Sequence, residues 1–410
     1  MFSHPLHVGR PGIGNRAAFL RRVEQILDSR WLTNDGQMVR ELERRIAQYI
    51  GVRHCVALAS GTTALEVAAR ALDLSGEVIV PSWTFAATAH ALYWQGITPV
   101  FADIDSETHN LSPQAVRRKI TPRTTGIVGV HLWGRPAPVD ALQAIADEYG
   151  LKLMFDAAHA FGNTCKGRGI GNFGACEVFS FHATKAFSTI EGGAIATNDD
   201  DLAERARSMR NFGFRNADGA VCVGINGKMS EIHAAFGLTS LESLNEVIAV
   251  NQANYRDYAD ALGNVPGVAL LPHDARERSN FQYVVIEIRE DPKAPPRANR
   301  DEILTALHRH NVLARPYFWP GVHAMRPYRD LFPHADRDLP NTIEVAARIL
   351  VLPTGADIDR KTIARIAAII RNPHVRAPAR AHLGGSPENR VPIPPPQPFR
   401  TKETLLHEQY

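Results

Sequence analysis

The sequence predicts an α/β chain, with a large and mostly parallel sheet covered by helices and a smaller α+β domain after it. Short apolar runs alternate with helical stretches through the first half of the chain, a pattern typical of parallel sheets. After about residue 230 the alternation gives way to a long helical stretch and a β-rich segment. A chain of 410 residues is also too long for one simple core. We expect domains at residues 15–240 and 241–372, and a tail at 373–410.

The elements of the first domain follow from the spacing of apolar residues. From about residue 16 to residue 50 these residues recur at helical spacing. The strands are expected where short apolar runs occur, at 56–59, 77–80, 98–101, 125–130 and 152–155. The helices between them are expected at 62–72, 86–94 and 139–149.

The second domain begins with a helical pattern from residue 231 to about 262. A β-rich segment at 282–288 and helices at 302–310, 342–350 and 360–370 complete it. The tail from 373 is rich in proline and polar residues, so it is expected to be poorly ordered or extended over the surface.

Composition excludes several classes of function. With 46 basic and 43 acidic residues, the net charge of +3 does not favour binding to nucleic acid or to an anionic membrane. No window is apolar enough to span a bilayer, and the N-terminus lacks a signal-peptide pattern, so we expect a cytoplasmic protein. The four cysteines form no C-x-x-C pair and H-E-x-x-H is absent, so no metal site is expected.

A Ser-Gly-Thr motif at residues 60–62 joins the first expected strand to the next helix. The N–H groups at a helix N-terminus lack partners and carry partial positive charge, which suits a phosphate. Gly61 would let the chain approach such an anion closely. An ordinary helix cap by Ser60 or Thr62 accounts for the same residues, so both interpretations stay open here.

The motif F-D-A-A-H-A at residues 155–160 places Asp156 at the carboxyl end of an expected strand. Ligand sites of open α/β sheets lie at that end of the strands. A carboxylate there could pair with a buried pyridinium nitrogen and keep it protonated. Capping of the following turn is the alternative.

Lys185 ends the segment S-F-H-A-T-K at residues 180–185, and E-G-G-A at 191–194 leads into a further strand. A lysine in a desolvated site loses its proton more easily and can attack an aldehyde. Ser180 and Thr184 offer hydroxyls to a phosphate or to the local backbone. Most lysines lie in exposed loops, but the joint spacing of the three motifs favours a reactive one.

These motifs, in this order, resemble the DegT/DnrJ/EryC1/StrS family of pyridoxal-phosphate-dependent sugar aminotransferases. The resemblance continues through residues 81–85, 224–231, 315–320 and 350–353, and it covers about residues 10–372. It implies PLP fold type I, the fold of aspartate aminotransferase, with pyridoxal 5′-phosphate as cofactor. It also implies a homodimer with shared active sites.

The resemblance assigns roles to the matching residues. Lys185 would carry the cofactor as a Schiff base, Asp156 would bind the ring nitrogen, and Phe85 would stack on the ring. His159 would contact the ring hydroxyl, at a position that glutamine often holds. The phosphate would be held by Ser60, Gly61, Thr62, Ser180 and Asn226 of the partner subunit. Residues 224–228 lack the aromatic residue and the arginine that often surround this asparagine.

The implied reaction is transamination of a nucleotide-linked keto sugar, with L-glutamate as the amino donor. The segment 181–185 favours a 4-keto-6-deoxy hexose as acceptor. The residues expected to contact the substrate are Lys228, Arg215, Arg315, Tyr317 and His323. For each of them an ordinary surface or loop position is the alternative.

Three other functions are alternatives to this one. An amino-cyclitol aminotransferase, acting on a keto-inositol type of substrate, is barely separable by sequence. A non-catalytic regulator that binds the cofactor or a sugar is disfavoured, because the catalytic residues are complete and no helix-turn-helix is evident. A dehydratase of the same family is disfavoured because Lys185 is present, whereas that branch carries histidine there.

Overall fold

The computed structural model describes residues 1–216, 219–289 and 298–374, and these residues form one compact unit. The expected tail at 373–410 lies outside the described residues from position 375 onward. The division into domains near residue 240 stays a prediction. Among the described helices, none has both the length and the apolarity needed to cross a membrane.

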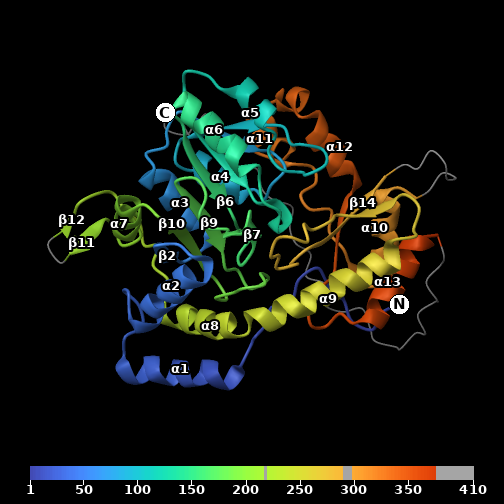
Figure 1. Ribbon diagram of the computed structural model, residues 1–410, viewed down its shortest axis with the longest axis horizontal. Coiled ribbons are helices and arrows are strands. Elements are labelled where there is room, and N and C mark those ends of the chain that lie inside the picture. The colour runs from blue at the N-terminus through green and yellow to red at the C-terminus, as the bar shows by residue number, and fades with distance from the viewer. Residues whose placement is uncertain (217–218, 290–297, 375–410) are drawn as a thin grey trace, which may run out of the picture. The chain divides into compact units, whose positions relative to one another are not determined.

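A seven-stranded sheet forms the centre of the N-terminal part and confirms the predicted α/β class (Figure 1). Its order is β2-β10-β9-β6-β5-β3-β4, in which β10 is antiparallel to both neighbours and every other adjacent pair is parallel. Its strands are nearly continuous apolar runs because both faces are buried. The strands are β2 (His54–Leu58), β3 (Glu77–Pro81), β4 (Thr98–Ala102), β5 (Thr124–Val130), β6 (Lys152–Asp156), β9 (Cys176–Ser180) and β10 (Gly193–Thr197).

Helices cover both faces of this sheet and bury two apolar clusters against it. Successive side chains of a strand point to opposite faces, so Val56 enters one cluster and Ala57 the other. One face is covered by α3 (Gly61–Ala71), α4 (Ala87–Tyr93) and α7 (Asp200–Met209). The other is covered by α2 (Gln37–Ile50), α5 (Pro113–Lys119), α6 (Val139–Tyr149) and α8 (Glu231–Glu242).

The helical pattern predicted from about residue 16 to residue 50 is divided into α1 (Arg16–Ser29) and α2. Arg30, Asn34 and Asp35 between them have positive φ angles of 55°, 67° and 60°, which a continuous right-handed helix does not allow. The helix α1 packs on α8 at the outer side of the molecule (Figure 1). Periodicity alone did not reveal this break.

The N-terminus of α2 is capped by a residue from a distant part of the chain. Gly36 is the N-cap residue and has no side chain to accept a hydrogen bond. Glu231 accepts the N–H groups of Gly36 and Met38 at 3.0 and 2.7 Å instead. A Cβ at Gly36 would lie 2.5 Å from the Glu231 carboxyl carbon, so this contact requires glycine.

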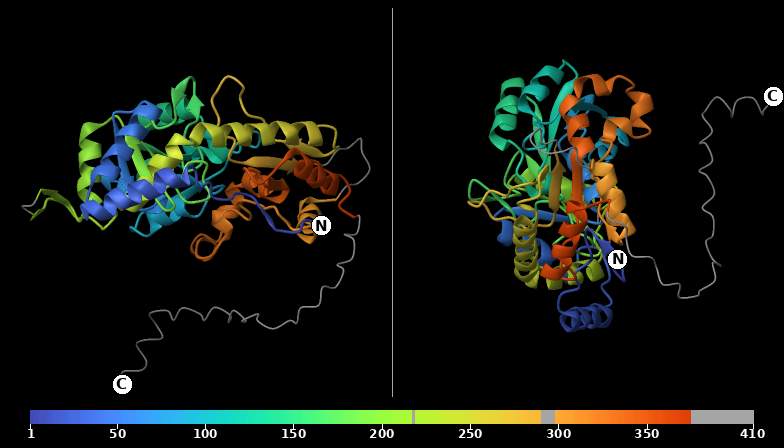
Figure 2. Two further views of the ribbon diagram at one scale, coloured as in Figure 1. Left: turned by 90° about the horizontal axis from the view of Figure 1, so that it is seen from below. Right: turned by 90° about the vertical axis from the view of Figure 1, so that its right-hand side faces the viewer.

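The predicted helix from 231 to 262 is also divided, at Ser243, into α8 and α9 (Leu244–Leu262). Seen from below in Figure 2, the yellow α9 runs alongside the orange C-terminal elements. There a three-stranded antiparallel sheet, in the order β13-β14-β16, packs with α9, α10 and α13. These elements are β13 (Val268–Leu270), β14 (Val284–Ile288), β16 (Ile349–Leu352), α10 (Arg300–Arg309) and α13 (Arg360–Arg371).

The predicted helix at 342–350 is too long at its end. The helix α12 (Pro340–Arg348) stops two residues earlier, and Ile349 and Leu350 begin the buried strand β16. Pairing with β14 overrides the helical pattern there. Other short elements are β1 (Leu6–His7) with β15 (Val312–Leu313), β7 (Thr164–Cys165) with β8 (Arg168–Gly169), β11 (Phe214–Asn216) with β12 (Gly219–Ala220), and α11 (Tyr328–Leu331).

The register of the large sheet brings the sequence motifs to one edge. Asp156, the last residue of β6, pairs with Val178 of β9, and β9 ends two residues later at Ser180. Gly193 at the start of β10 pairs with both Ser180 and Leu58. The segments around 60, 156, 180 and 193 are therefore neighbours at the carboxyl edge of the parallel strands, where ligand sites form.

Candidate active site

Asp156 is a buried carboxylate at this edge, with 5% of its surface exposed. One oxygen accepts the Thr88 hydroxyl at 2.8 Å and the other accepts the Ala158 N–H at 3.0 Å. The Thr84 hydroxyl lies 2.9 Å from that of Thr88 and extends the chain of hydrogen bonds. Burial raises the pKa of Asp156, while these bonds and the Lys185 charge lower it only in part. A cationic ligand would therefore be strongly favoured beside it.

Lys185 lies half-buried in the loop after β9. Its backbone N–H donates to the His182 carbonyl at 2.9 Å, and its Nζ lies 3.4 Å from the Tyr283 hydroxyl. The next N–H, that of Ala186, donates to the Gln282 side chain at 2.7 Å. Lys185 also lines a cavity of about 680 Å³ together with residues 9–15 and the junction of α8 and α9. This space is large enough for a ligand, but Asp156, His159 and the start of α3 do not line it.

His159 follows Asp156 on the same segment and is enclosed by aromatic rings. Trp133 and Phe318 stack on its imidazole at 6.1 and 5.8 Å, and the Tyr283 ring meets it edge-on at 4.7 Å. Burial and then the Lys185 charge hold the pKa of His159 well below its usual range. Because Nδ1 accepts the Trp133 N–H at 3.3 Å, Nε2 carries the proton of the neutral ring and can donate it.

The start of α3 forms a narrow glycine-walled cradle. Ser60 caps the helix, since its hydroxyl accepts the Thr63 N–H at 3.0 Å. The N–H groups of Gly61 and Thr62 then have no acceptor within the helix. A Cβ at Gly61 would lie 2.8 Å from the Ser180 Cβ, and one at Gly193 would lie 2.6 Å from the Gly61 nitrogen. Both interpretations of this motif, a cap and an anion site, are compatible with the geometry.

Phe85 and Asn226 are exposed. Phe85 precedes α4, has 59% of its surface exposed, and meets the Phe318 ring at 6.3 Å. Asn226 forms a β-bridge with Asn211 and lies in an exposed stretch. Stacking by Phe85 and a phosphate contact by Asn226 stay predictions.

The expected substrate residues do not gather around Lys185 in the single chain. Lys228 and Arg215 line a separate cavity of about 320 Å³, where Lys228 donates to Asn211 at 2.9 Å and Arg215 pairs with Glu204. Burial lowers the pKa of Lys228.

The other three expected substrate residues lie on or near the chain segment that carries Phe318. Tyr317 stacks on Phe318 at 5.3 Å, and Arg315 bridges to Val351 through its backbone with an exposed side chain. His323 is buried and its Nδ1 lies 2.6 Å from the Ser82 hydroxyl. Substrate contacts by all five residues stay predictions.

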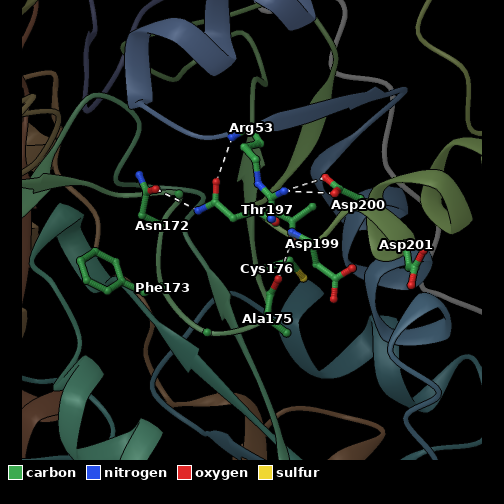
Figure 3. A pocket seen from close by; sticks show the side chains of 12 residues that line it. Arg53, Asn172, Phe173, Ala175, Cys176, Thr197, Asp199, Asp200 and Asp201 are labelled. Carbon is green, nitrogen blue, oxygen red and sulfur yellow. Dashed lines mark hydrogen bonds and ion pairs between the residues drawn. The ribbon is translucent and has the colours of Figure 1, made fainter.

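A different pocket of about 560 Å³ lies at the opposite end of the sheet, beside Cys176, the first residue of β9 (Figure 3). Its polar groups are paired with one another: Arg53 with Asp200 at 3.0 Å, and Asn198 with Asn172 at 3.1 Å. Neither Asp156 nor Lys185 lines this pocket.

Several residues that shape the site belong to none of the sequence motifs, namely Thr88, Trp133, Asn280, Gln282 and Tyr283. Thr88 carries no local signal, because only the tertiary fold brings it to Asp156, 68 positions further along the sequence. The polar pair Asn280 and Gln282 directly before the apolar strand β14 was the one visible hint.

Comparison with known proteins supports the interpretation of these motifs. The model of the DegT/DnrJ/EryC1/StrS aminotransferase family matches residues 15–371. The chain is 35% identical over 366 residues to dTDP-4-amino-4,6-dideoxy-D-glucose transaminase of Escherichia coli, covering 88% of this chain and 97% of that protein. It is also 35% identical to GDP-perosamine synthase of Caulobacter vibrioides, covering 85% and 93% of the two chains.

Solved structures also match the chain. A structure of DesI determined in the presence of its TDP-sugar product matches with a TM-score of 0.85 and 50% identity, over 90% of this chain and 93% of that one. Helicobacter pylori PseC, an aminotransferase, matches with a TM-score of 0.82 and 26% identity, over 90% and 99%. These matches confirm the predicted fold, and the chain belongs to the DegT/DnrJ/EryC1/StrS family of aminotransferases.

Proposed function

We propose that the protein transfers an amino group from L-glutamate to a nucleotide-linked keto sugar, with pyridoxal 5′-phosphate bound at Lys185. The observation that carries the proposal is the buried Asp156 carboxylate at the sheet edge that also presents Lys185 and the glycine-walled start of α3. A 4-keto-6-deoxy hexose is the favoured acceptor.

The residues of the site fit this cofactor. A protonated ring nitrogen would offset the desolvation that raises the pKa of Asp156. Glycine at 61 and 193 lets the start of α3 pack closely on Ser180 and on β10, beside N–H groups suited to a phosphate. Lys185 supplies the amine for covalent attachment, and the exposed Phe85 offers a ring for stacking.

Each residue then has a distinct task. When bound, pyridoxal phosphate supplies an aldehyde that captures amines and a ring that accepts electrons. Asp156 holds the proton on the ring nitrogen. Once the amino donor releases Lys185, this amine takes the proton from the donor α-carbon, a general-base role worth about 10²–10⁴-fold in rate. His159 would donate from Nε2 to the oxygen of the ring hydroxyl.

The choice of acceptor rests on the relatives. The Escherichia coli relative is named for a dTDP-linked 4-amino-4,6-dideoxy sugar, and the Caulobacter relative for a GDP-linked product. The DesI structure was determined with a TDP-sugar product. An acceptor on a nucleoside diphosphate needs space beside Lys185, and the cavity of about 680 Å³ offers it.

We expect a half-reaction to separate the candidate acceptors. Enzyme loaded with amine from glutamate, and then freed of glutamate, should aminate a 4-keto-6-deoxy nucleotide sugar stoichiometrically, as measured by mass spectrometry of the product. A 3-keto nucleotide sugar and a keto inositol serve as comparison acceptors. Amination of the 3-keto sugar alone would rule out the C4 assignment, and amination of the keto inositol alone would make the protein an amino-cyclitol aminotransferase.

We also propose a homodimer with shared active sites. Asn226 is exposed, and Val221, Val223 and Ile225 before it have 64%, 93% and 42% of their surfaces exposed. Exposed apolar side chains gathered in one segment are typical of a surface that packs on a partner. In a two-fold symmetric dimer, each subunit would place its segment 221–226 at the active site of the other subunit.

Mixing inactive variants tests the shared site. Subunits with Lys185→Ala and subunits with Asn226→Ala should regain about one quarter of wild-type activity after exchange, because half of the dimers are mixed and each has one intact site. A mixture of Lys185→Ala with Asp156→Asn is the control and should stay inactive, since those residues belong to one subunit's site. Confirmed exchange without recovery would contradict shared sites.

A further inference from the structure

The segment 280–283 connects the small antiparallel sheet to both catalytic segments of the large sheet. It leads directly into β14. The Asn280 side chain donates to the carbonyls of His159 and Phe161 at 2.9 and 3.1 Å. The Gln282 side chain accepts the Ala186 N–H at 2.7 Å. The segment is therefore hydrogen-bonded both to the loop that follows Asp156 and to the loop that carries Lys185.

Tyr283 adds a contact with the end of the Lys185 side chain. Its hydroxyl lies 3.4 Å from Lys185 Nζ and accepts from it. In the described part of the chain this is the one hydrogen bond recorded for either group. The Tyr283 ring is fixed by edge-on contacts with His159 at 4.7 Å and Trp133 at 5.5 Å, so the position of its hydroxyl is determined.

A free lysine side chain samples many rotamers, and fixing it in one place costs conformational entropy. An oxygen at a fixed position removes part of this freedom, because an N–H of the amine donates to it in one conformation. Gln282 restrains the backbone at Ala186 while Tyr283 restrains the side chain at Lys185, so adjacent residues hold both ends of the reactive residue.

We infer that Tyr283 is a positioning residue that holds the Lys185 amine whenever the amine is not bonded to the cofactor. The inference rests on the proposed function, in which Lys185 is released in every half-reaction. The hydroxyl accepts a hydrogen bond from Nζ, and the amine is thereby returned to one place for proton transfer and for reattachment. No bond to Tyr283 forms or breaks.

The test compares Tyr283→Phe with a matched variant, Tyr255→Phe. Both lose a phenol hydroxyl near the small sheet, but the Tyr255 hydroxyl donates to the Leu271 carbonyl at 2.9 Å and is not in contact with Lys185. We expect Tyr283→Phe to lower kcat by up to about tenfold, as the loss of one hydrogen bond of ordinary strength would do, with the KM for glutamate unchanged. Tyr255→Phe should leave kcat unchanged.

A second measurement does not depend on turnover. Pyridoxal phosphate added to the cofactor-free protein should attach to Lys185 several-fold more slowly in Tyr283→Phe, as followed by absorbance. Pyridoxamine phosphate cannot attach to lysine, so its Kd reports the integrity of the pocket and should stay within about twofold. Equal loss of pyridoxamine phosphate binding would show a structural role and overturn the inference.

One further experiment separates the attachment of the cofactor at Lys185 from the role of Tyr283. Borohydride reduction of the wild-type protein should fix the cofactor to a peptide containing Lys185. Attachment to another lysine would overturn both the proposed function and the role of Tyr283. If the cofactor is attached to Lys185 but Tyr283→Phe keeps the wild-type kcat and the wild-type attachment rate, only the role of Tyr283 is overturned.

Discussion

Replacement of Lys185 by alanine should lower glutamate-dependent turnover at least about 10³-fold, because general acid–base catalysis by one side chain contributes up to about 10⁴-fold and the covalent anchor is lost as well. Among the described residues, the groups that interact with the half-buried Nζ are the Tyr283 phenol, the buried His159 and Asp156, and Asp156 is already bonded to Thr88 and Ala158. Turnover is measured by mass spectrometry of the aminated product.

The matched control for this variant is Lys152→Ala. Lys152 begins β6, whereas Asp156 ends the same strand, and its side chain is exposed. Its loss should change turnover less than twofold. A Lys185→Ala protein with turnover within tenfold of wild type would mean that another residue performs the proton transfer.

Replacement of Asp156 by asparagine should lower kcat about 10³-fold while the cofactor still binds. A carboxylate about 4 Å from a cationic ring nitrogen contributes about 4 kcal/mol at an effective dielectric constant of 20, and asparagine removes this charge with little change in shape. Its amide oxygen can still accept from Thr88 or Ala158, so the fold should persist. A variant with near wild-type kcat would show that Asp156 is not the partner of the ring.

A pH dependence follows from the same carboxylate. Burial raises the pKa of Asp156 in the cofactor-free protein, and a cationic ring nitrogen would lower it in the complex. Binding therefore favours the ionised carboxylate, so affinity is full above the raised pKa and falls as the pH drops through it. Titrations of cofactor affinity should show this acid limb in wild type, and it should be absent in Asp156→Asn.

The large sheet and its reactive edge could be predicted from the sequence, because each strand is marked by its own consecutive residues. Apolar runs at residues 77–80 and 152–155 appear as β3 and β6, since a strand buried on both faces needs consecutive apolar side chains. The positions of Asp156 and Lys185 directly after strands then follow from the parallel topology. The breaks at residues 30–36 and at Ser243 could not be predicted, because the helical spacing of apolar residues continues on both sides.

The sequence by itself determined the fold class, the family and the reactive side chains of one sheet edge. The tertiary structure decided which distant groups serve those side chains. Tyr283 meets Lys185 across 98 positions of sequence, Thr88 meets Asp156 across 68, and Glu231 caps α2 across 195. Periodicity and motifs report burial and local conformation. Contacts of this kind depend on how separate helices and sheets pack, and that packing is fixed only when the whole core is assembled.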